Sequence, residues 1–324
     1  MRILHRFFSH WQNWLGLLLV AAFVVMSVAA PWLSPQDPLS PGPIKVVGKP
    51  SDFQPQPPSP EAPLGTLSGQ ISVYHTLVWG AWPALKFGLL VAGTAALIGV
   101  LVGTTSAYFG GFFNSFLMRI TDSFLAFPVI AGVVLIRQVV SISLYNAGIR
   151  FYTGGLVVMA TSNGGYTELP EKLPLLLAIL QKIDPVVIAF ILFSWMPYAR
   201  IMNAVVLRIK QMEYIQAARA LGAGPATLIF RHLIPNAIAP AVVMAARDVG
   251  GMVLLQATFT FIGMGGTSLW GMLLVRGRDW IIDPRGILTY WWVFLPATLA
   301  LVLFGIGWNL LGDGLNDLLN PRQG

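Results

Sequence analysis

The sequence predicts an all-α integral membrane protein with about six transmembrane helices. Of its 324 residues, 56% are hydrophobic and only 10% are charged, whereas soluble domains carry about 25% charged residues. Several apolar stretches approach the ~20 residues that a helix needs to cross the hydrocarbon core of a bilayer. Much of the protein surface is therefore expected to face lipid, so membrane spans rather than soluble domains are the units to count.

Charge and cysteine content narrow the class of function. The net charge is +7, but the basic residues flank apolar stretches and form no continuous run. Residues in such positions meet anionic lipid headgroups, so we expect membrane lipid and no nucleic acid among the partners. The chain has no cysteine, which excludes disulfides, thiol chemistry and cysteine-ligated metals.

Residues 1–34 are predicted to form a cytoplasmic head and the first span, which covers residues 14–33. Arg2 and Arg6 make the head basic. Pro31 directly follows two alanines, which makes a poor signal-peptide cleavage site, so we expect an uncleaved helix.

Residues 35–82 are predicted to be an external segment. Eleven prolines lie from Pro31 to Pro63, and proline in a helix interior removes a hydrogen bond and clashes with the preceding turn. Most of this segment is therefore expected to be extended, with a short interfacial helix near residues 71–79.

Residues 83–313 are predicted to form the core, which holds the other five spans. These spans cover residues 84–108, 123–136, 185–205, 236–262 and 291–311. Gly99 and Gly103 form a small-xxx-small pair that lets another helix approach closely, and we favour a helix of the same chain over another subunit. Arg119 and Asp122 are expected in a short polar turn before the 123–136 span.

The segments that connect these spans differ in charge. Residues 200–235 carry five basic residues against one acid, which favours a cytoplasmic position. Residues 137–184 mix both signs and are predicted to be an external insertion with some helix, and an extra re-entrant pair of helices stays open as an alternative. Residues 263–290 are predicted to be an external glycine-rich loop, and residues 314–324 a polar cytoplasmic tail.

The most distinctive local pattern begins at Glu213. Four residues share one helical face at the spacing i, i+3, i+4 and i+7: Tyr214, Ala217, Ala218 and Leu221. Gly222 suits the left-handed residue that ends a helix, and Pro225 can open the next one. The small, flat face needs a partner, which is either the rest of this chain or another protein.

This segment resembles the cytoplasmic "EAA" loop of ABC importer permeases. That loop has an acidic or amide residue, two alanines, a glycine after three more residues, and a later motif that ends in proline. Here the pattern is Gln216-Ala217-Ala218, then Gly222, then Pro235. Gln216 stands where the family usually has glutamate.

Other stretches resemble the second, C-type permease of dipeptide and oligopeptide importers. They include Pro63-Leu-Gly-Thr66, Ala107-Tyr-Phe-Gly-Gly111, Thr260-Phe-Ile-Gly-Met-Gly265 and Asn309-Leu-Leu-Gly-Asp-Gly314. The chain departs from the family pattern in residues 67–72, which lack the usual charges, and at Gln256, where a glutamate is common. Residues 137–184 look longer than is usual, and we favour a lineage insertion over an added surface for a binding protein.

The resemblance implies a type I ABC importer permease fold in a bacterial-type inner membrane, with both chain ends cytoplasmic. It implies a heterodimer with a second homologous permease, two cytoplasmic ABC ATPase subunits and an external solute-binding protein. The ATPases would bind ATP and Mg²⁺, so this chain is expected to have no cofactor, no catalytic residue and no metal site. The residues expected at the ATPase-coupling interface are Glu213, Gln216, Ala217, Ala218, Arg219, Gly222 and Pro235. For Arg219, pairing with an ATPase carboxylate and simple solvation both stay open.

Arg247 and Asp248 are predicted to lie inside the span at residues 236–262. Ionisable residues at membrane depth are functional candidates. They and Gln256 are expected either to line the translocation path, where they could meet charged peptide termini, or to lie at the interface between the two permeases.

The sequence leaves two other kinds of transporter as alternatives. An ABC permease for nickel or another small solute would share this scaffold. An ion-coupled secondary transporter is more remote, because no inverted repeat is visible. The chain lacks the G-x-x-x-x-G-K-[ST] phosphate loop, so we expect no ATP hydrolysis by this chain and no enzyme activity.

Overall fold

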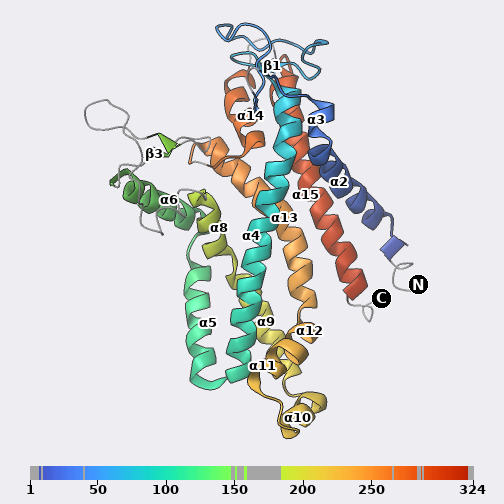
Figure 1. The fold of residues 1–324 in the computed structure, drawn as a ribbon, viewed down its shortest axis with the longest axis vertical. Helices are drawn as coiled ribbons and strands as arrows, with labels where there is room; N and C mark the ends of the chain where they lie inside the picture. The colour runs from blue at the N-terminus through green and yellow to red at the C-terminus, as the bar shows by residue number, and fades with distance from the viewer. Residues whose placement is uncertain are drawn as a thin grey trace.

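The structure is a computed structural model of the chain. It describes residues 7–8, 10–38, 41–146, 150–151, 157–158, 184–264, 266–282, 286 and 288–319. Long helices run along the longest axis of the described part (Figure 1). The only strands there form two short antiparallel hairpins, in which β1 pairs with β2 and β3 with β4. Their bounds are Thr66–Leu67, Ile71–Ser72, Arg150–Phe151 and Val157–Val158.

Five helical stretches are long and apolar enough to cross a membrane, and a bent pair would make a sixth. The five are α2 (Trp11–Val28), α4 (Val73–Phe109), α8 with α9 (Pro185–Ser194 and Met196–Ile209), α13 (Ala239–Ile262) and α15 (Trp291–Leu319). The bent pair is α5 (Gly111–Ala126) and α6 (Val129–Asn146). The predicted all-α membrane architecture is confirmed.

The second span begins earlier than the sequence suggested. Ser72 caps α4, because its Oγ accepts a hydrogen bond from the backbone N–H of His75 at 3.3 Å and so satisfies one of the free donors at the helix start. From Val73 the helix runs without a break to Phe109. The prediction of a separate interfacial helix at residues 71–79 is therefore wrong, and the boundary expected after residue 82 falls inside α4.

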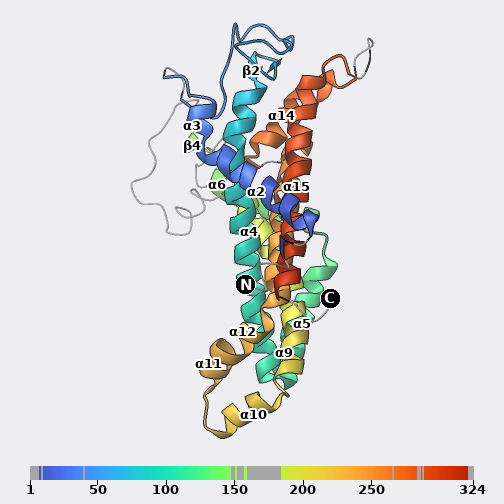
Figure 2. The same ribbon diagram turned by 90° about the vertical axis from the view of Figure 1, so that its right-hand side faces the viewer.

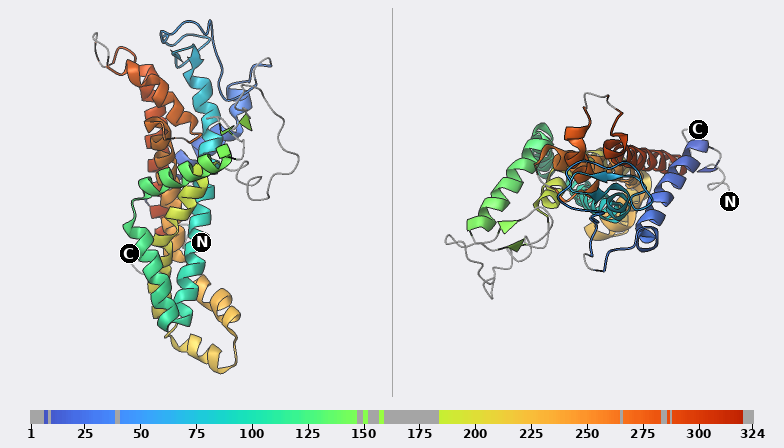
Figure 3. Two further views of the ribbon diagram at one scale, coloured as in Figure 1. Left: turned by 90° about the vertical axis from the view of Figure 1, so that its left-hand side faces the viewer. Right: turned by 90° about the horizontal axis from the view of Figure 1, so that it is seen from above.

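The third span also differs. Arg119 and Asp122 lie inside α5 rather than in a polar turn, and Asp122 forms an ion pair with Arg200 of α9 at 2.9 Å. The chain instead bends by 91° between α5 and α6. Phe127, just before Pro128, is extended with ψ 130°, as expected because proline disfavours the helical conformation of its predecessor. Figure 3 shows α6 lying across the other helices.

Helix α4 packs closely against its neighbours through glycine. A side chain at Gly99 would clash with the carbonyl oxygen of Trp195, and one at Gly103 with that of Ala199. Both contacts are with the α8–α9 span of this chain, which confirms the expected packing within one subunit.

The proline-rich segment covers one end of the helices. Leu67 and Ile71 are buried there against Leu273 of α14 (Leu269–Gly277) and Val293 of α15. Part of the predicted 263–290 loop is thus helical, in α14 and in the 3₁₀ turn η2 (Arg278–Trp280). A short helix, α3 (Ala30–Leu33), joins α2 to this segment.

His75 fastens the proline-rich segment to α4. Its ring is buried, with Nε2 3.0 Å from the carbonyl oxygen of Gly42 and Nδ1 2.7 Å from Oγ of Ser34. Because a carbonyl can only accept, Nε2 donates in the neutral ring and Nδ1 accepts from the Ser34 hydroxyl. The first turn of α4 is therefore hydrogen-bonded to Ser34 and Gly42, which lie before and within the proline-rich segment.

The opposite end holds α10 (Glu213–Ala220), α11 (Pro225–Thr227), the π-helical turn η1 (Leu228–Leu233) and α12 (Ile234–Ala237), as Figures 1 and 2 show. Just inside this end, a buried polar network joins three helices. Asn203 of α9 donates to Oδ1 of Asn114 in α5 at 2.6 Å and to Oγ of Ser106 in α4 at 3.2 Å. The Ser106 hydroxyl donates to the same Asn114 oxygen.

Some predicted segments fall partly outside the described residues. Residues 147–149, 152–156 and 159–183 of the expected insertion are among them, as are residues 1–6 of the head and 320–324 of the tail. The expected tail boundary at residue 314 lies within α15, which continues to Leu319.

Candidate functional site

Helix α10 is anchored to this chain along one side. Ile215 is 1% exposed and packs with Val206 of α9 and Leu228 and Leu233 of η1, and Ala218 contacts the same apolar cluster. The four residues predicted to share one partner-binding face therefore do not all face the same way, because Ala218 packs against this chain.

The remaining side of α10 is open. Tyr214 is 43% exposed and Leu221 is 89% exposed, and Ala217 between them is exposed as well. Glu213, also exposed, lies in the first turn, where a carboxylate is favoured by the helix dipole. An apolar surface around a small central residue is thus free to meet another protein.

Gly222 ends α10 as predicted. Its φ is +87°, and its N–H bonds to the carbonyl of Arg219 at 3.0 Å while Ala223 bonds to Ala218 at 3.0 Å. These two bonds are those of a Schellman motif, which needs a left-handed residue. A Cβ added at Gly222 would meet nothing within 4 Å, so it would point into the open space beside α10.

Pro225 occupies the first turn of α11, as the sequence indicated. Pro235 lies in the first turn of α12, directly after the π-helical turn η1. A proline ring clashes with the carbonyl four residues earlier in a regular α-helix. The wider turn of η1 relieves this clash and lets the chain continue helically toward α13.

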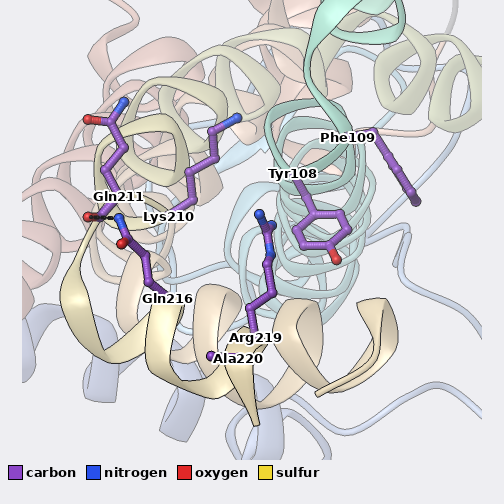
Figure 4. Close-up of a pocket in the computed structure, with 7 residues that line it drawn as sticks. All are labelled: Tyr108, Phe109, Lys210, Gln211, Gln216, Arg219 and Ala220. Carbon is purple, nitrogen blue, oxygen red and sulfur yellow. Dashed lines mark hydrogen bonds between the residues drawn. The ribbon is translucent and has the colours of Figure 1, made fainter. Parts of the chain in front are cut away.

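A hollow of about 680 Å³ lies between α10 and the C-terminal end of α4 (Figure 4). It is lined by Tyr108, Phe109, Lys210, Gln211, Gln216, Arg219 and Ala220. Arg219 reaches over the Tyr108 ring, with its guanidinium carbon 5.7 Å from the ring centre. This cation–π contact within the chain is a third role for Arg219, beside the two that the sequence left open.

Two further contacts fix the hollow. Lys210 donates from Nζ to the carbonyl oxygen of Ala107 at 2.7 Å, which satisfies one of the free carbonyls at the end of α4. Gln216 donates from Nε2 to the carbonyl oxygen of Gln211 at 3.0 Å, so its side chain supports the loop before α10. Sequence reasoning did not place Tyr108 or Lys210 at this site: Tyr108 was noted only within the stretch Ala107–Gly111, and Lys210 carries no local motif.

The three polar residues expected in the fifth span occupy different surroundings. Arg247 forms an ion pair with Asp313 of α15, so its partner belongs to the same chain. Asp248 accepts a hydrogen bond from the hydroxyl of Tyr198 in α9 at 2.5 Å. Gln256 is only 4% exposed and packs inside the subunit, which fits neither a path-lining nor an interface position.

Metal-binding geometry is missing in the part of the chain that the structure describes. No three His, Cys, Asp or Glu side chains gather there in a group that could hold an ion.

Comparison with known protein families decides what kind of membrane protein this is. A family model described as the binding-protein-dependent transport system inner membrane component matches residues 95–324, which is most of the chain. The chain belongs to this family of transport permeases. A second model, the N-terminal TM domain of oligopeptide transport permease C, matches residues 1–58 of the permease. The multi-pass helical fold is that of an inner-membrane transport component.

Individual relatives of the permease align over nearly its full length. A putative peptide transport system permease of Brucella abortus is 27% identical over 98% of this chain and 90% of its own. A probable D,D-dipeptide transport system permease of Escherichia coli is 28% identical over 95% of this chain and 86% of its own. The oligopeptide transport system permease of Bacillus subtilis is 26% identical over 98% of this chain and 88% of its own.

Proposed function

We propose that this chain is the C-type permease subunit of an ABC importer for peptides, and that cytoplasmic ATPase subunits drive it through α10. One observation carries the proposal. Tyr214, Ala217 and Leu221 form an exposed apolar surface on a helix whose other side is fixed to this chain by Ile215 and Arg219. A movement of a partner bound to this surface can therefore be transmitted through α10 to α4 and α9.

The proposal that the solute is a peptide rests on the relatives, whose names refer to peptide, D,D-dipeptide and oligopeptide transport. These names favour peptides over nickel or another small solute. In the proposed complex, a second homologous permease completes the path, and an external binding protein delivers the peptide. Two ATPase subunits bind ATP and Mg²⁺, so this chain is not itself an enzyme.

In the proposed orientation, α10 and both chain ends face the cytoplasm. The chain ends lie together, because Asn13 of α2 donates a hydrogen bond to Asp317 of α15 at 3.3 Å. From there α2 runs toward the proline-rich segment, which lies at the opposite end from α10 (Figure 1). The proline-rich segment is then external.

The test is ATP hydrolysis by the whole complex. This chain is co-expressed with the permease, ATPases and binding protein encoded beside it, and Gly222→Trp is compared with wild type. We expect peptide-loaded binding protein to stimulate hydrolysis by the wild type and not by the variant, because the indole fills the open space beside α10.

Two control variants separate docking from damage. Gly93→Trp places an indole where a Cβ also meets nothing within 4 Å, but in the middle of α4, and it should be stimulated normally. Gly222→Asn adds a small side chain that tolerates the left-handed conformation, and it should keep most of the stimulation. If this chain instead purifies without ATPases and moves solute down an ion gradient, the proposal fails.

A further inference from the structure

Helix α13 is covered by other helices of this chain on three sides. Val249 packs on Gly88 of α4, and Gly250 faces Gly305 of α15. Tyr198 of α9 covers the third side through its bond to Asp248. With 3.6 residues per turn, these contacts leave one side of α13, roughly opposite α4, that the described chain covers only in part.

This open side runs the length of α13. Thr258 and Ile262 are exposed on this side, and Gly251 is partly exposed. Met244 and Leu255, at the same helical spacing, are partly exposed and also contact apolar clusters of this chain. Near its middle there is free space, because a Cβ added at Gly251 would meet nothing within 4 Å. The space lies about one turn from Asp248 along the helix.

Asp248 stands at the edge of the open side, where α13 meets α9. It is partly exposed, and the hydroxyl that binds its Oδ2 belongs to the fully buried Tyr198. Asp248 lies nine residues after the start of α13 at Ala239, or about 14 Å along the helix, which is near mid-membrane. A carboxylate at this depth is costly unless a cation or strong donors accompany it.

No cation of the described chain accompanies Asp248. Its neighbour Arg247 points about 100° away around the helix and is neutralised by Asp313. The other two ion pairs of the described residues, Arg200 with Asp122 and Arg278 with Asp279, do not involve it. The open side of α13 therefore carries one carboxylate, that of Asp248, which is hydrogen-bonded to Tyr198 and lies near the free space at Gly251.

We propose that Asp248, positioned by Tyr198, binds the ammonium group of the solute as it passes along the open side of α13. The free amino terminus of a peptide is such a group, so this inference rests on the proposed function. The solute is the occupant rather than a partner subunit, because Gly251 leaves room beside the carboxylate and Thr258 adds a polar group along the same side. Tyr198 is a positioning residue, since its ring is buried and only its hydroxyl reaches the carboxylate.

The first test compares two forms of one radiolabelled tripeptide, with a free or an acetylated amino terminus. The complete complex is placed in proteoliposomes, loading of each peptide onto the binding protein is measured, and transport is compared at saturating loaded binding protein. We expect wild type to move the free-amine form about tenfold faster, which corresponds to ~1.4 kcal/mol. Asp248→Asn should bring the ratio close to one by slowing the free-amine form.

The pattern across variants separates binding from structure. Tyr198→Phe keeps the carboxylate but not its donor, so it should lower the ratio by less than Asp248→Asn. Asp122→Asn makes the same chemical change on α5 and should leave the ratio unchanged. If Asp248→Asn slows both peptides equally, or neither, the ammonium site is refuted while transport of peptide by the wild type still supports the proposed function.

A second test does not depend on delivery by the binding protein. Because the chain has no cysteine, Gly251→Cys gives this subunit a single thiol in the free space near Asp248. We expect a quaternary-ammonium methanethiosulfonate to react with it faster than an anionic sulfonate reagent, and Asp248→Asn in the same background to abolish the preference. Leu254→Cys, three residues away on the side toward α15, should show no charge preference. A Gly251→Cys thiol that reacts with neither reagent, or equally with both, overturns the proposal.

Discussion

The guanidinium carbon of Arg219 lies 5.7 Å from the centre of the Tyr108 ring. This contact joins α10 to the last turn of α4, although the two residues are far apart in the sequence. Together with the buried Ile215, it makes α10 part of the helical framework instead of a loose loop.

Removing the Arg219 guanidinium should loosen α10. A partly exposed cation–π contact contributes about 0.5–1 kcal/mol, so Arg219→Ala should speed hydrogen exchange of the α10 amides by roughly two- to fivefold. Arg208→Ala, which removes an exposed arginine of α9, is the matched control and should leave that exchange unchanged. Tyr108→Leu combined with Arg219→Ala should add little to either single change. Independent, additive effects would contradict the contact.

Gly222 should tolerate alanine poorly despite the open space around it. A non-glycine residue in the left-handed conformation costs about 1–2 kcal/mol, and φ of Gly222 is +87°. Gly222→Ala should therefore increase hydrogen exchange at Gly222 and Ala223, whose N–H groups close the end of α10. Gly224 is the control, because its φ is −70° and its surroundings are equally open. Equal exchange in Gly222→Ala and Gly224→Ala would show that the backbone at residue 222 is not strained.

The α4–α9 contact should depend on glycine at residue 103. A side chain there collides with the backbone of Ala199, and overpacking of this kind costs about 1–3 kcal/mol or more when backbone must move. We expect Gly103→Val to lower the thermal unfolding midpoint in detergent. Gly93→Val lies in the same helix but meets nothing within 4 Å, so its midpoint should match wild type. A normal midpoint for Gly103→Val would mean that α4 and α9 are not in close contact.

The polar network of Ser106, Asn114 and Asn203 should be sensitive to the loss of Asn203, which donates two of its hydrogen bonds. Asn203→Ala leaves the buried oxygens of Ser106 and Asn114 with fewer partners, and an unsatisfied buried polar group costs about 1–3 kcal/mol. The thermal midpoint should fall accordingly. Asn236 makes an exposed bond to the carbonyl of His232, so Asn236→Ala should have little effect. If both variants behaved alike, the network would not be contributing to stability.

Features set by local chemistry were predictable from the sequence. Gly222 marks the end of α10 because few other residues adopt its left-handed conformation. Pro225 marks the start of α11 because its fixed φ suits the first helical turn, where no backbone N–H is needed. Gly99 and Gly103 indicated close helix packing because they have no side chain to hold a neighbouring helix away. The five spans found as single long stretches are those whose apolar runs are long and weakly interrupted.

Features set by distant contacts were not predictable. Nothing near Tyr108 or Lys210 in the sequence indicates that they meet α10. Ala218 was assigned to the partner face, but burial of Ile215 rotates α10 so that Ala218 turns inward. Arg247 was expected to meet another molecule, and its partner Asp313 lies 66 residues further along the chain. Such pairings depend on which helices become neighbours.

Helix α4 is held at both ends, by the bonds of His75 at one and by Arg219 over Tyr108 at the other. The 33 residues between His75 and Tyr108 correspond to about 50 Å of continuous helix, which exceeds the thickness of a bilayer core. If the two ends shift together, thermodynamic reciprocity follows. If a protein that binds at the proline-rich segment changes the affinity of a second protein for α10 by some factor, binding of the second protein changes the affinity of the first by the same factor. One helix would then make each side of the membrane an effector of the other.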